Sequence, residues 1–210
     1  MIFNKDMLRV YAITDRTWVG KQSFLEQIEE ALKSGITMLQ LREKDASSAQ
    51  LAEVAKDVLK LCKKYNVPLI IDDDYETAIK VGADGVHVGI DDKPVSLIRK
   101  IAPKHFIIGA TAKTIEQAQK AMDDGADYLG VGAVFPSPTK KNAIRITRDD
   151  LKKIISSVDI PVVAIGGITL QNIEEVYGCG ASGVAVISAV FGADCISKAV
   201  AQLIEKTKEL

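Results

Sequence analysis

The stretch Val81-Gly-Ala-Asp-Gly-Val-His-Val88 decides the fold, because it joins the end of a helix to a buried strand through one tight turn. Glycine relieves the left-handed backbone that follows a last helical turn, and the apolar strand begins at once. Similar phrases recur at Lys33-Ser-Gly-Ile36, Asp124-Gly-Ala-Asp127 and Cys179-Gly-Ala-Ser-Gly183. Strand, helix and glycine turn, repeated at intervals of roughly 25 residues, predict parallel strands with right-handed crossovers.

Eight short runs rich in β-branched residues are predicted as strands, with amphipathic stretches between them. The expected strands are Arg9–Thr14, Thr37–Leu41, Pro68–Ile71, Gly85–Val88, Phe106–Ala110, Tyr128–Val131, Pro161–Ile165 and Gly183–Ile187. The expected helices are Ser23–Ser34, Ser47–Tyr65, Tyr75–Lys80, Ile115–Asp123, Arg148–Ser156, Leu170–Tyr177 and Ile196–Lys208. Eight such units can close into a single (β/α)8 TIM barrel over residues 1–210. An open doubly wound sheet is the alternative, disfavoured because no G-x-G-x-x-G phrase follows the first strand.

The composition fits one buried core and argues against a polyanionic partner. Of the 210 residues, 47% are hydrophobic and 5% aromatic, which suits parallel strands covered by helices. A net charge of −1 without a long basic run argues against nucleic acid or a membrane surface as partner. No segment reaches the roughly 18 apolar residues of a membrane span, and the N-terminus lacks a signal-peptide pattern. The three cysteines form no C-x-x-C pair, so we expect a cytoplasmic protein without a disulfide framework.

Polar residues occur where the predicted strands end, which is where catalytic residues of such barrels lie. The second strand runs into Gln40-Leu-Arg-Glu-Lys44. The alternation of a strand places Gln40, Arg42 and Lys44 on one face. Each charge alone fits a surface cluster, but two cations and an amide leaving a buried strand together are costly unless an anion meets them. The shared face therefore favours an anion site.

The third and fourth predicted strands end in carboxylates. Asp72-Asp73-Asp74 follows strand three, and Asp91-Asp92 follows strand four. Adjacent carboxylates repel one another, which indicates a cation or donors nearby, and Asp74 is expected to cap the following helix. Carboxylates from both strand ends could hold one Mg2+ together with a substrate phosphate. His87, within strand four, is expected to be a hydrogen-bonded core histidine rather than a ligand.

Glycines and hydroxyls mark the ends of the later strands. Gly166-Gly-Ile-Thr169 follows strand seven, and Ile187-Ser188 follows strand eight. The loops after these two strands often form a phosphate site in barrels, because paired glycines let backbone N–H groups approach the phosphate. A glycine turn needed only for packing is the alternative. The loop Ser137-Pro-Thr-Lys140 offers further donors for an anion, or else is a solvated basic loop.

These motifs together resemble the thiamine-phosphate synthase family, and the similarity covers essentially the whole chain. The most specific parts are Gln40-x-Arg42-x-Lys44, Asp73, Gly85-Val-His-Val-Gly89 with Asp92, Pro136-Ser-Pro-Thr139-Lys140, and Gly166-Gly167-Ile168-Thr169. The resemblance implies an Mg2+-dependent transfer. An aminopyrimidine methyl diphosphate loses pyrophosphate by way of a transient pyrimidine cation, and the nitrogen of a thiazole phosphate takes its place.

The resemblance also implies roles for individual residues. Arg42, Lys44 and Lys140 would be catalytic, and Asp73 and Asp92 would ligate Mg2+. The pyrimidine diphosphate would contact Gln40, Leu41, Arg42, Glu43, Lys44, Asp72, Thr111 and Lys140. The thiazole phosphate would contact Ser137, Pro138, Thr139, Gly167, Ile187 and Ser188. The implied partners are small phosphorylated substrates, and the prediction also allows a homo-oligomer.

Three residues depart from the family pattern: Asp72 stands for a usual Asn, Ile90 for a common Gln and Thr111 for a common Ser. Asp72 would add a negative charge near the diphosphate, stay protonated, or pair with Lys44. The alternative functions are a thiazole tautomerase of the same fold, a phosphate-binding barrel of histidine or tryptophan biosynthesis, and a non-enzymatic sensor. The paired metal carboxylates and the Thr-Lys loop argue against the tautomerase.

Overall fold

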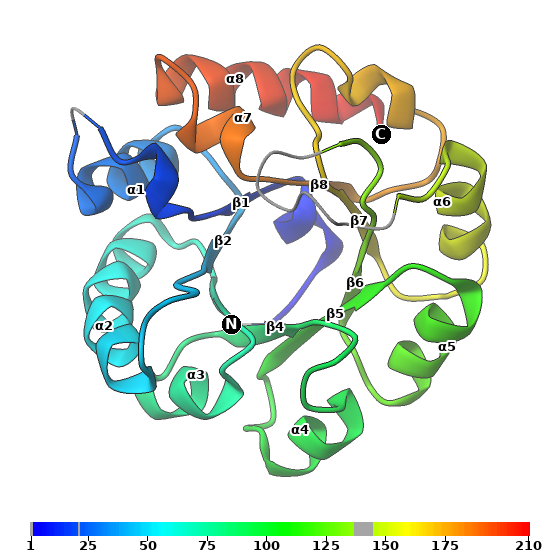
Figure 1. The fold of residues 1–210 in the computed structure, drawn as a ribbon, viewed down its shortest axis with the longest axis horizontal. Helices are drawn as coiled ribbons and strands as arrows, with labels where there is room; N and C mark the ends of the chain where they lie inside the picture. The colour runs from blue at the N-terminus through cyan, green and yellow to red at the C-terminus, as the bar shows by residue number, and fades with distance from the viewer. Residues whose placement is uncertain (1, 21, 137–144) are drawn as a thin grey trace.

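The computed structural model describes residues 2–20, 22–136 and 145–210, and its strands form a closed parallel barrel (Figure 1). Each strand pairs with the next along the chain, and β8 pairs with β1 to close the ring. The strands are β1 Val10–Ile13, β2 Met38–Leu41, β3 Leu69–Asp72, β4 Gly85–Val88, β5 Ile107–Ala112, β6 Tyr128–Val131, β7 Val162–Ile165 and β8 Gly183–Val186. The predicted (β/α)8 barrel is confirmed, and the open doubly wound sheet is wrong.

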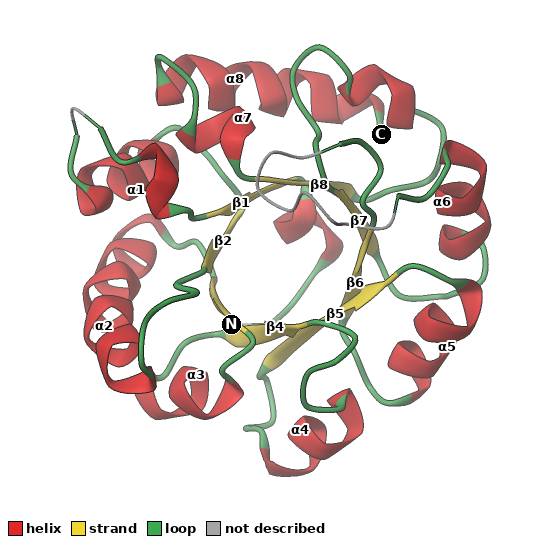
Figure 2. Cartoon of the chain, in the orientation of Figure 1, coloured by secondary structure: helices red, strands yellow, loops and turns green. Residues whose placement is uncertain are grey.

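Helices surround the strands on the outside of the barrel, as Figure 2 shows. They are α1 Phe24–Lys33, α2 Ser48–Tyr65, α3 Tyr75–Val81, α4 Val95–Ile101, α5 Ile115–Asp123, α6 Arg148–Ile155, α7 Ser188–Phe191 and α8 Ile196–Lys206. Ser23 and Ser47 begin α1 and α2 with capping boxes, which satisfy backbone N–H groups of the first turn. Within the described part of the chain, no helix is long and apolar enough to cross a membrane.

Two hydrophobic cores follow from the alternation of the strands. The larger core lies between the strands and the helices, and includes Leu39, Leu41 and Ile71. The smaller core fills the barrel interior, where Tyr11 and Tyr128 are its largest buried side chains. Positions of the same parity, further along each strand, point toward the rim at the carboxyl ends, so the sequence of each strand sets which residues reach the site.

The structure differs from the sequence prediction mainly in one segment. The expected helix at Leu170–Tyr177 is wrong, because only a 3-10 turn at Ile173–Val176 forms there. The side chain of Asn172 accepts from the backbone N–H of Thr169 and donates to the backbone oxygen of Gly167. These bonds tie Asn172 to the glycine turn and compete with a regular helix. The strand predictions hold to within two residues at their ends, although β3 and β5 run on to include Asp72 and Thr111.

Candidate active site

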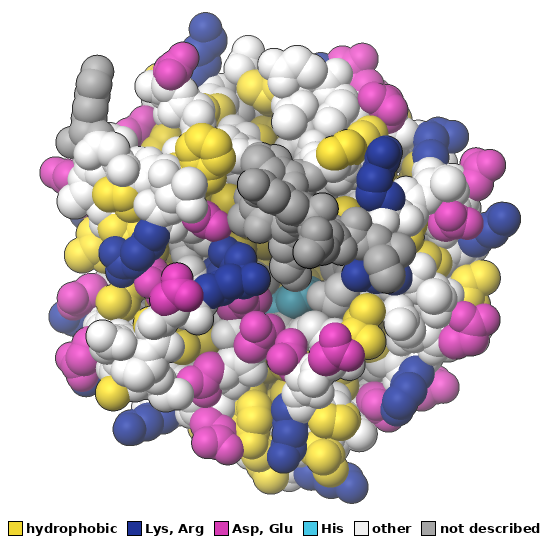
Figure 3. Space-filling view, viewed as in Figure 1, with side chains coloured by type: hydrophobic (Ala, Val, Ile, Leu, Met, Phe, Trp, Pro, Cys, Tyr) yellow, Lys and Arg dark blue, Asp and Glu magenta, His cyan; other side chains and the backbone are white. Residues whose placement is uncertain are grey.

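The predicted site residues that the structure describes lie at one rim of the barrel. All strands are parallel, so their carboxyl ends meet at the same edge. Acidic and basic side chains gather around the barrel axis on the face shown in Figure 3. The described site residues at this rim are Gln40, Leu41, Arg42, Glu43, Lys44, Asp72, Asp73, Asp92, Thr111, Gly167, Ile187 and Ser188. Ser137, Pro138, Thr139 and Lys140 lie outside the described residues.

Arg42 is held between two carboxylates directly after β2. Its Nη1 donates to Asp15 Oδ2 at 2.9 Å, and its Nε lies 3.7 Å from Asp72 Oδ2. The side chains of Arg42 and Asp15 are each only 10% exposed. The guanidinium is therefore fixed in place, and the remaining N–H groups are oriented before any ligand arrives.

The carboxylate of Asp15 is a partner of Arg42 that the sequence prediction missed. Burial opposes its ionisation, but hydrogen bonds from Thr17 and the nearby Arg42 charge outweigh this, so the pKa of Asp15 lies below its usual value. Asp15 follows Tyr11 and Ile13 with the same strand parity. That alternation is the signal that could have placed Asp15 at the rim.

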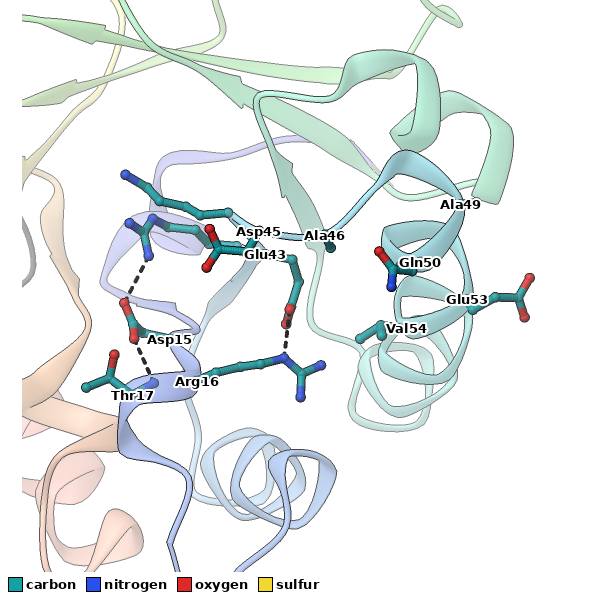
Figure 4. Close-up of a pocket in the computed structure, with 12 residues that line it drawn as sticks. Asp15, Arg16, Thr17, Glu43, Asp45, Ala46, Ala49, Gln50, Glu53 and Val54 are labelled. Atoms are coloured by element: carbon teal, nitrogen blue, oxygen red, sulfur yellow. Dashed lines mark hydrogen bonds and ion pairs between the residues drawn. The ribbon is translucent and has the colours of Figure 1, made fainter.

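A cavity of about 890 Å³ opens beside Arg42, between the 3-10 turn Arg16–Trp18 and the first turns of α2 (Figure 4). Arg42, Glu43 and Lys44 line it on the barrel side. Figure 4 shows Glu43 reaching toward Arg16, and Glu43 Oε2 accepts from Arg16 Nε at 2.7 Å. The acidic residues of this lining are Asp15, Glu43, Asp45 and Glu53. Because Glu43 pairs with Arg16, Arg42 and Lys44 are the cations of the wall that can face an anion.

The positions of Leu41 and Asp72 limit what these two residues could offer to the pyrimidine diphosphate. The side chain of Leu41 is buried in the core that faces the helices, so a ligand at the rim can meet only its backbone. Asp72 lies beside Arg42, with its Oδ2 3.7 Å from Arg42 Nε. A carboxylate at this position limits the positive charge that Arg42 offers to an anion.

The two predicted metal ligands lie at the ends of adjacent strands, β3 and β4. Asp73 has a φ of 61°, a left-handed conformation that aspartate adopts more readily than most residues. Asp92 lies in the turn after β4, where its Oδ2 accepts from the backbone N–H of Gly89 at 2.7 Å. Both side chains are exposed. No cluster of three or more metal-binding side chains occurs among the described residues.

The glycine turn after β7 has a packing role as well as an open donor. Gly166 and Gly167 have φ of 98° and 65°, and a Cβ on Gly167 would lie 2.2 Å from the backbone oxygen of Pro136. Packing and the positive φ therefore both favour glycine at these two positions. In the described part of the chain, however, no acceptor takes the backbone N–H of Gly167 or of Ser188. Two donors at the same rim are left for an anion.

Gln40 and Thr111 are joined through the barrel interior by a chain of hydrogen bonds. Gln40 Nε2 donates to Tyr11 Oη at 2.7 Å, and the hydroxyls of Tyr11 and Tyr128 lie 2.9 Å apart. His87 Nδ1 lies 3.1 Å from Tyr128 Oη, and its Nε2 lies 3.0 Å from Thr111 Oγ1. His87 is buried and hydrogen-bonded, which confirms the prediction of a core histidine. Asp74 also caps α3 as predicted.

The chain is a (β/α)8 barrel with an anchored guanidinium at its carboxyl rim, and carboxylates follow the adjacent strands β3 and β4 at the same rim. The family model described as "Thiamine monophosphate synthase" matches residues 10–190. The chain belongs to the thiamine-phosphate synthase family, as its resemblance predicted.

Individual relatives match the chain over nearly all of its length. It is 44% identical over 194 residues to the thiamine-phosphate synthase of Clostridium tetani, covering 92% of this chain and 93% of the relative. It is 45% identical over 186 residues to that of Methanobrevibacter smithii, covering 89% and 88%. The solved thiamine phosphate pyrophosphorylase of Pyrococcus furiosus superposes with a TM-score of 0.89 at 41% identity, covering 98% of each chain.

Proposed function

We propose that this protein is a thiamine-phosphate synthase, a transferase that joins an aminopyrimidine methyl diphosphate to a thiazole phosphate. The observation that carries the proposal is the identity of 44% to a thiamine-phosphate synthase over 92% of the chain. The fold alone would not carry it, because this barrel hosts many unrelated reactions. The site adds the chemistry that such a transfer needs.

The reaction breaks one bond and forms one bond. The C–O bond between the pyrimidine methylene and the diphosphate breaks, and the electron pair leaves with the diphosphate. The lone pair of the thiazole nitrogen then forms the new C–N bond to the cationic methylene carbon. No enzyme nucleophile is required, so the protein has to stabilise the charge of the leaving group and align the two substrates.

The guanidinium of Arg42 is the best-supported group for the diphosphate. Its bonds to Asp15 and Asp72 fix its plane, and an oriented fork suits the planar recognition of phosphate oxygens. Lys44 lines the same cavity as a second cation. We infer that Lys140 completes this set, together with the amide of Gln40 and the hydroxyl of Thr111.

Asp73 and Asp92 fit a magnesium ion by the chemistry of their donors. Both are carboxylates that follow adjacent strands, and within the described part of the chain no hydrogen bond or ion pair engages the second oxygen of Asp92. Mg2+ is commonly held in proteins by one or two carboxylates, with water and substrate phosphate completing its shell. When bound, the ion would neutralise charge that develops on the diphosphate. We propose these two residues as its protein ligands.

The thiazole phosphate is proposed to lie at the ends of β7 and β8. The backbone N–H groups of Gly167 and Ser188, which have no acceptor within residues 2–20, 22–136 and 145–210, support this placement. Ile187 precedes Ser188 and would add its backbone, and Ser137, Pro138 and Thr139 would contact the ring. The two phosphorylated groups would then approach from opposite sides of the same rim.

One assay separates this proposal from its alternatives. Both substrates are supplied with and without Mg2+, and pyrophosphate and thiamine phosphate are followed together. We expect equimolar release of both products that depends on Mg2+. A thiazole tautomerase would convert the thiazole phosphate alone without pyrophosphate release, and a sensor would bind both substrates without turnover. Either result would contradict the proposal.

The variant Asp92→Ala sharpens the metal assignment. We expect it to abolish turnover while the circular dichroism spectrum and melting temperature stay close to those of the parent protein, because Asp92 is exposed. Asp91→Ala is the matched control, since it removes an adjacent exposed carboxylate with no assigned role. Full activity in Asp92→Ala would remove the proposed ligand pair.

A further inference from the structure

The buried hydrogen-bond chain from Gln40 to Thr111 crosses the barrel between two proposed substrate contacts. It passes through Tyr11 on β1, Tyr128 on β6 and His87 on β4, and all of its neighbouring atoms are 2.7 to 3.1 Å apart. Gln40, Tyr11, Tyr128 and His87 are all buried, and Thr111 reaches the rim. Buried polar groups in an apolar interior need partners for their donors, so the positions of the protons along this hydrogen-bond chain are constrained.

Counting the protons shows which group donates and which accepts at each step of the hydrogen-bond chain. Burial raises the pKa of both Tyr11 and Tyr128 well above the usual tyrosine value, so each keeps one hydroxyl proton. Tyr11 accepts from Gln40 Nε2 and therefore donates to Tyr128. Tyr128 then donates to Nδ1 of His87, which must be an acceptor. The ring proton is left on Nε2, where it donates to Thr111 Oγ1.

We propose that His87 is a positioning residue that turns the hydroxyl proton of Thr111 outward, toward an oxygen of the diphosphate. Because Nε2 donates to Thr111, the hydroxyl oxygen is an acceptor on its inner side and its proton is available at the rim. At the other end, Gln40 donates from Nε2 to Tyr11 Oη, so the hydrogen-bond chain does not use its carbonyl oxygen. The identity of the ligand rests on the proposed function, whereas the direction of the chain does not.

Two glycines make room for the rings that carry this chain. A Cβ on Gly109 would lie 2.1 Å from Cζ of Tyr128, and a Cβ on Gly130 would lie 3.0 Å from Cε1 of His87. Any larger residue at Gly109 would collide with the phenol. The neighbouring strands thus leave space for these two side chains, in keeping with a chain that holds them in register.

Asp72 is the charged neighbour of the chain. It is the register partner of His87 on β3, and its carboxylate lies beside Arg42. Its negative charge further raises the pKa of both tyrosines, which keeps their protons in place. The direction of the chain is therefore a property of the resting protein, before any substrate binds.

Nitrogen NMR tests the direction without any substrate. The protein has two histidines. A His105→Gln variant therefore assigns the ring resonances of 15N-histidine-labelled protein. In the parent protein, the exposed His105 serves as the internal control. We expect the His87 ring to be neutral with its proton on Nε2. In Tyr128→Phe, which removes the donor to Nδ1, we expect a mixture of the two tautomers. A proton on Nδ1 of His87 in the parent protein, or no change in Tyr128→Phe, overturns the proposal.

Kinetics test whether the orientation of the Thr111 hydroxyl matters for use of the diphosphate substrate. Thr111→Val should lower kcat/KM for the diphosphate substrate about tenfold or more, and Thr111→Ser should keep it within about twofold. His87→Gln retains an N–H that can reach Thr111 and should keep more activity than His87→Leu. The Kd for thiazole phosphate should stay unchanged in all four. An equal loss in the valine and serine variants, or in both His87 variants, contradicts the positioning role, while inactivity of the parent protein would contradict only the proposed function.

Discussion

The two sides of the barrel interior are built from different chemistry. Five strands, β1, β2, β4, β5 and β6, direct the linked polar side chains of Tyr11, Gln40, His87, Thr111 and Tyr128 inward. The inward positions of β7 and β8 are apolar, with Val163, Ile165 and Ala185. After these strands come the backbone N–H groups of Gly167 and Ser188, which meet no acceptor among the described residues. Under the proposed function, one side would recognise its ligand with oriented side chains, and the other with main-chain donors.

Under the proposed function, this difference would let the protein distinguish its two phosphorylated substrates. A leaving diphosphate gains charge during the reaction and benefits from cations and a metal. The phosphate of the thiazole keeps its charge throughout, so neutral backbone donors are enough to anchor it. Substitutions on the side-chain half should affect turnover, and substitutions on the backbone half should affect binding of the second substrate.

Among the substitutions considered for the two sides of the rim, Arg42→Ala should change activity the most. We expect kcat/KM for the diphosphate substrate to fall by about three orders of magnitude, because an oriented charge is lost, and stability to fall by about 2 kcal/mol, because Asp15 loses its partner. Arg16→Ala is the control for kcat/KM, since Arg16 lines the same cavity but is 52% exposed, pairs with Glu43 and lies over the Phe24 ring. Steady-state kinetics and urea unfolding measure both quantities. Equal losses in the two variants would contradict the role of Arg42.

Gly167→Ala should affect the side of the rim formed by the ends of β7 and β8. We expect KM for thiazole phosphate to rise about tenfold and stability to fall by about 2 to 3 kcal/mol, because the new Cβ meets the Pro136 oxygen at 2.2 Å. Gly82→Ala is the control, since Gly82 also has a positive φ, 73°, but has nothing within 4 Å of a new Cβ. It should cost only about 1 kcal/mol. A larger loss in Gly82→Ala, or an unchanged KM in Gly167→Ala, would count against this account.

Asp72→Asn should give a smaller change of opposite sign. Removal of a carboxylate 3.7 Å from the Arg42 guanidinium leaves more positive charge for an anion. We therefore expect the Kd of inorganic pyrophosphate with Mg2+, measured by calorimetry, to fall by a few-fold. Asp45→Asn, in the same cavity wall, is the control and should change this Kd less. Weaker pyrophosphate binding in Asp72→Asn would contradict the expectation.

Asp15→Asn should give the smallest effect, visible in the pH dependence of stability. The pKa of Asp15 is lower in the folded protein than in the unfolded chain, so the ionised group stabilises the fold above the unfolded value of about 3.9. That stabilisation is lost as the pH falls through the lower, folded pKa. The free energy of unfolding of Asp15→Asn should therefore depend less on pH below about pH 4. An unchanged slope in this range would contradict the ionised pairing with Arg42.

The fold could be predicted from the sequence because its signals are local. Each glycine turn ends a helix and starts a strand by its own backbone preferences, and the strand alternation fixes which residues turn inward. The segment at Leu170–Tyr177 was predicted wrongly because the bonds of Asn172 to the glycine turn depend on tertiary placement. Propensity and periodicity do not contain that information.

The site was predicted in part, for a related reason. Arg42 could be placed at the rim because it follows β2 directly, and Asp92 because it lies in the turn after β4. The partnership of Asp15 with Arg42 joins residues 27 positions apart, and the Tyr11–Tyr128 contact spans 117. Pairings of this kind arise only when the barrel closes, so no local pattern marks them.

The most direct test that the two ligands bind at different sides of the rim is to titrate each one separately into the 15N-labelled protein and follow it by NMR. We expect thiazole phosphate to shift the backbone amides of Gly167 and Ser188 and to leave the Arg42 side-chain Nε–H resonance unmoved. Pyrophosphate with Mg2+ should shift Arg42 Nε–H and leave those two amides in place. If thiazole phosphate shifted Arg42 Nε–H while the Gly167 and Ser188 amides stayed where they were, the assignment of the two halves would be wrong.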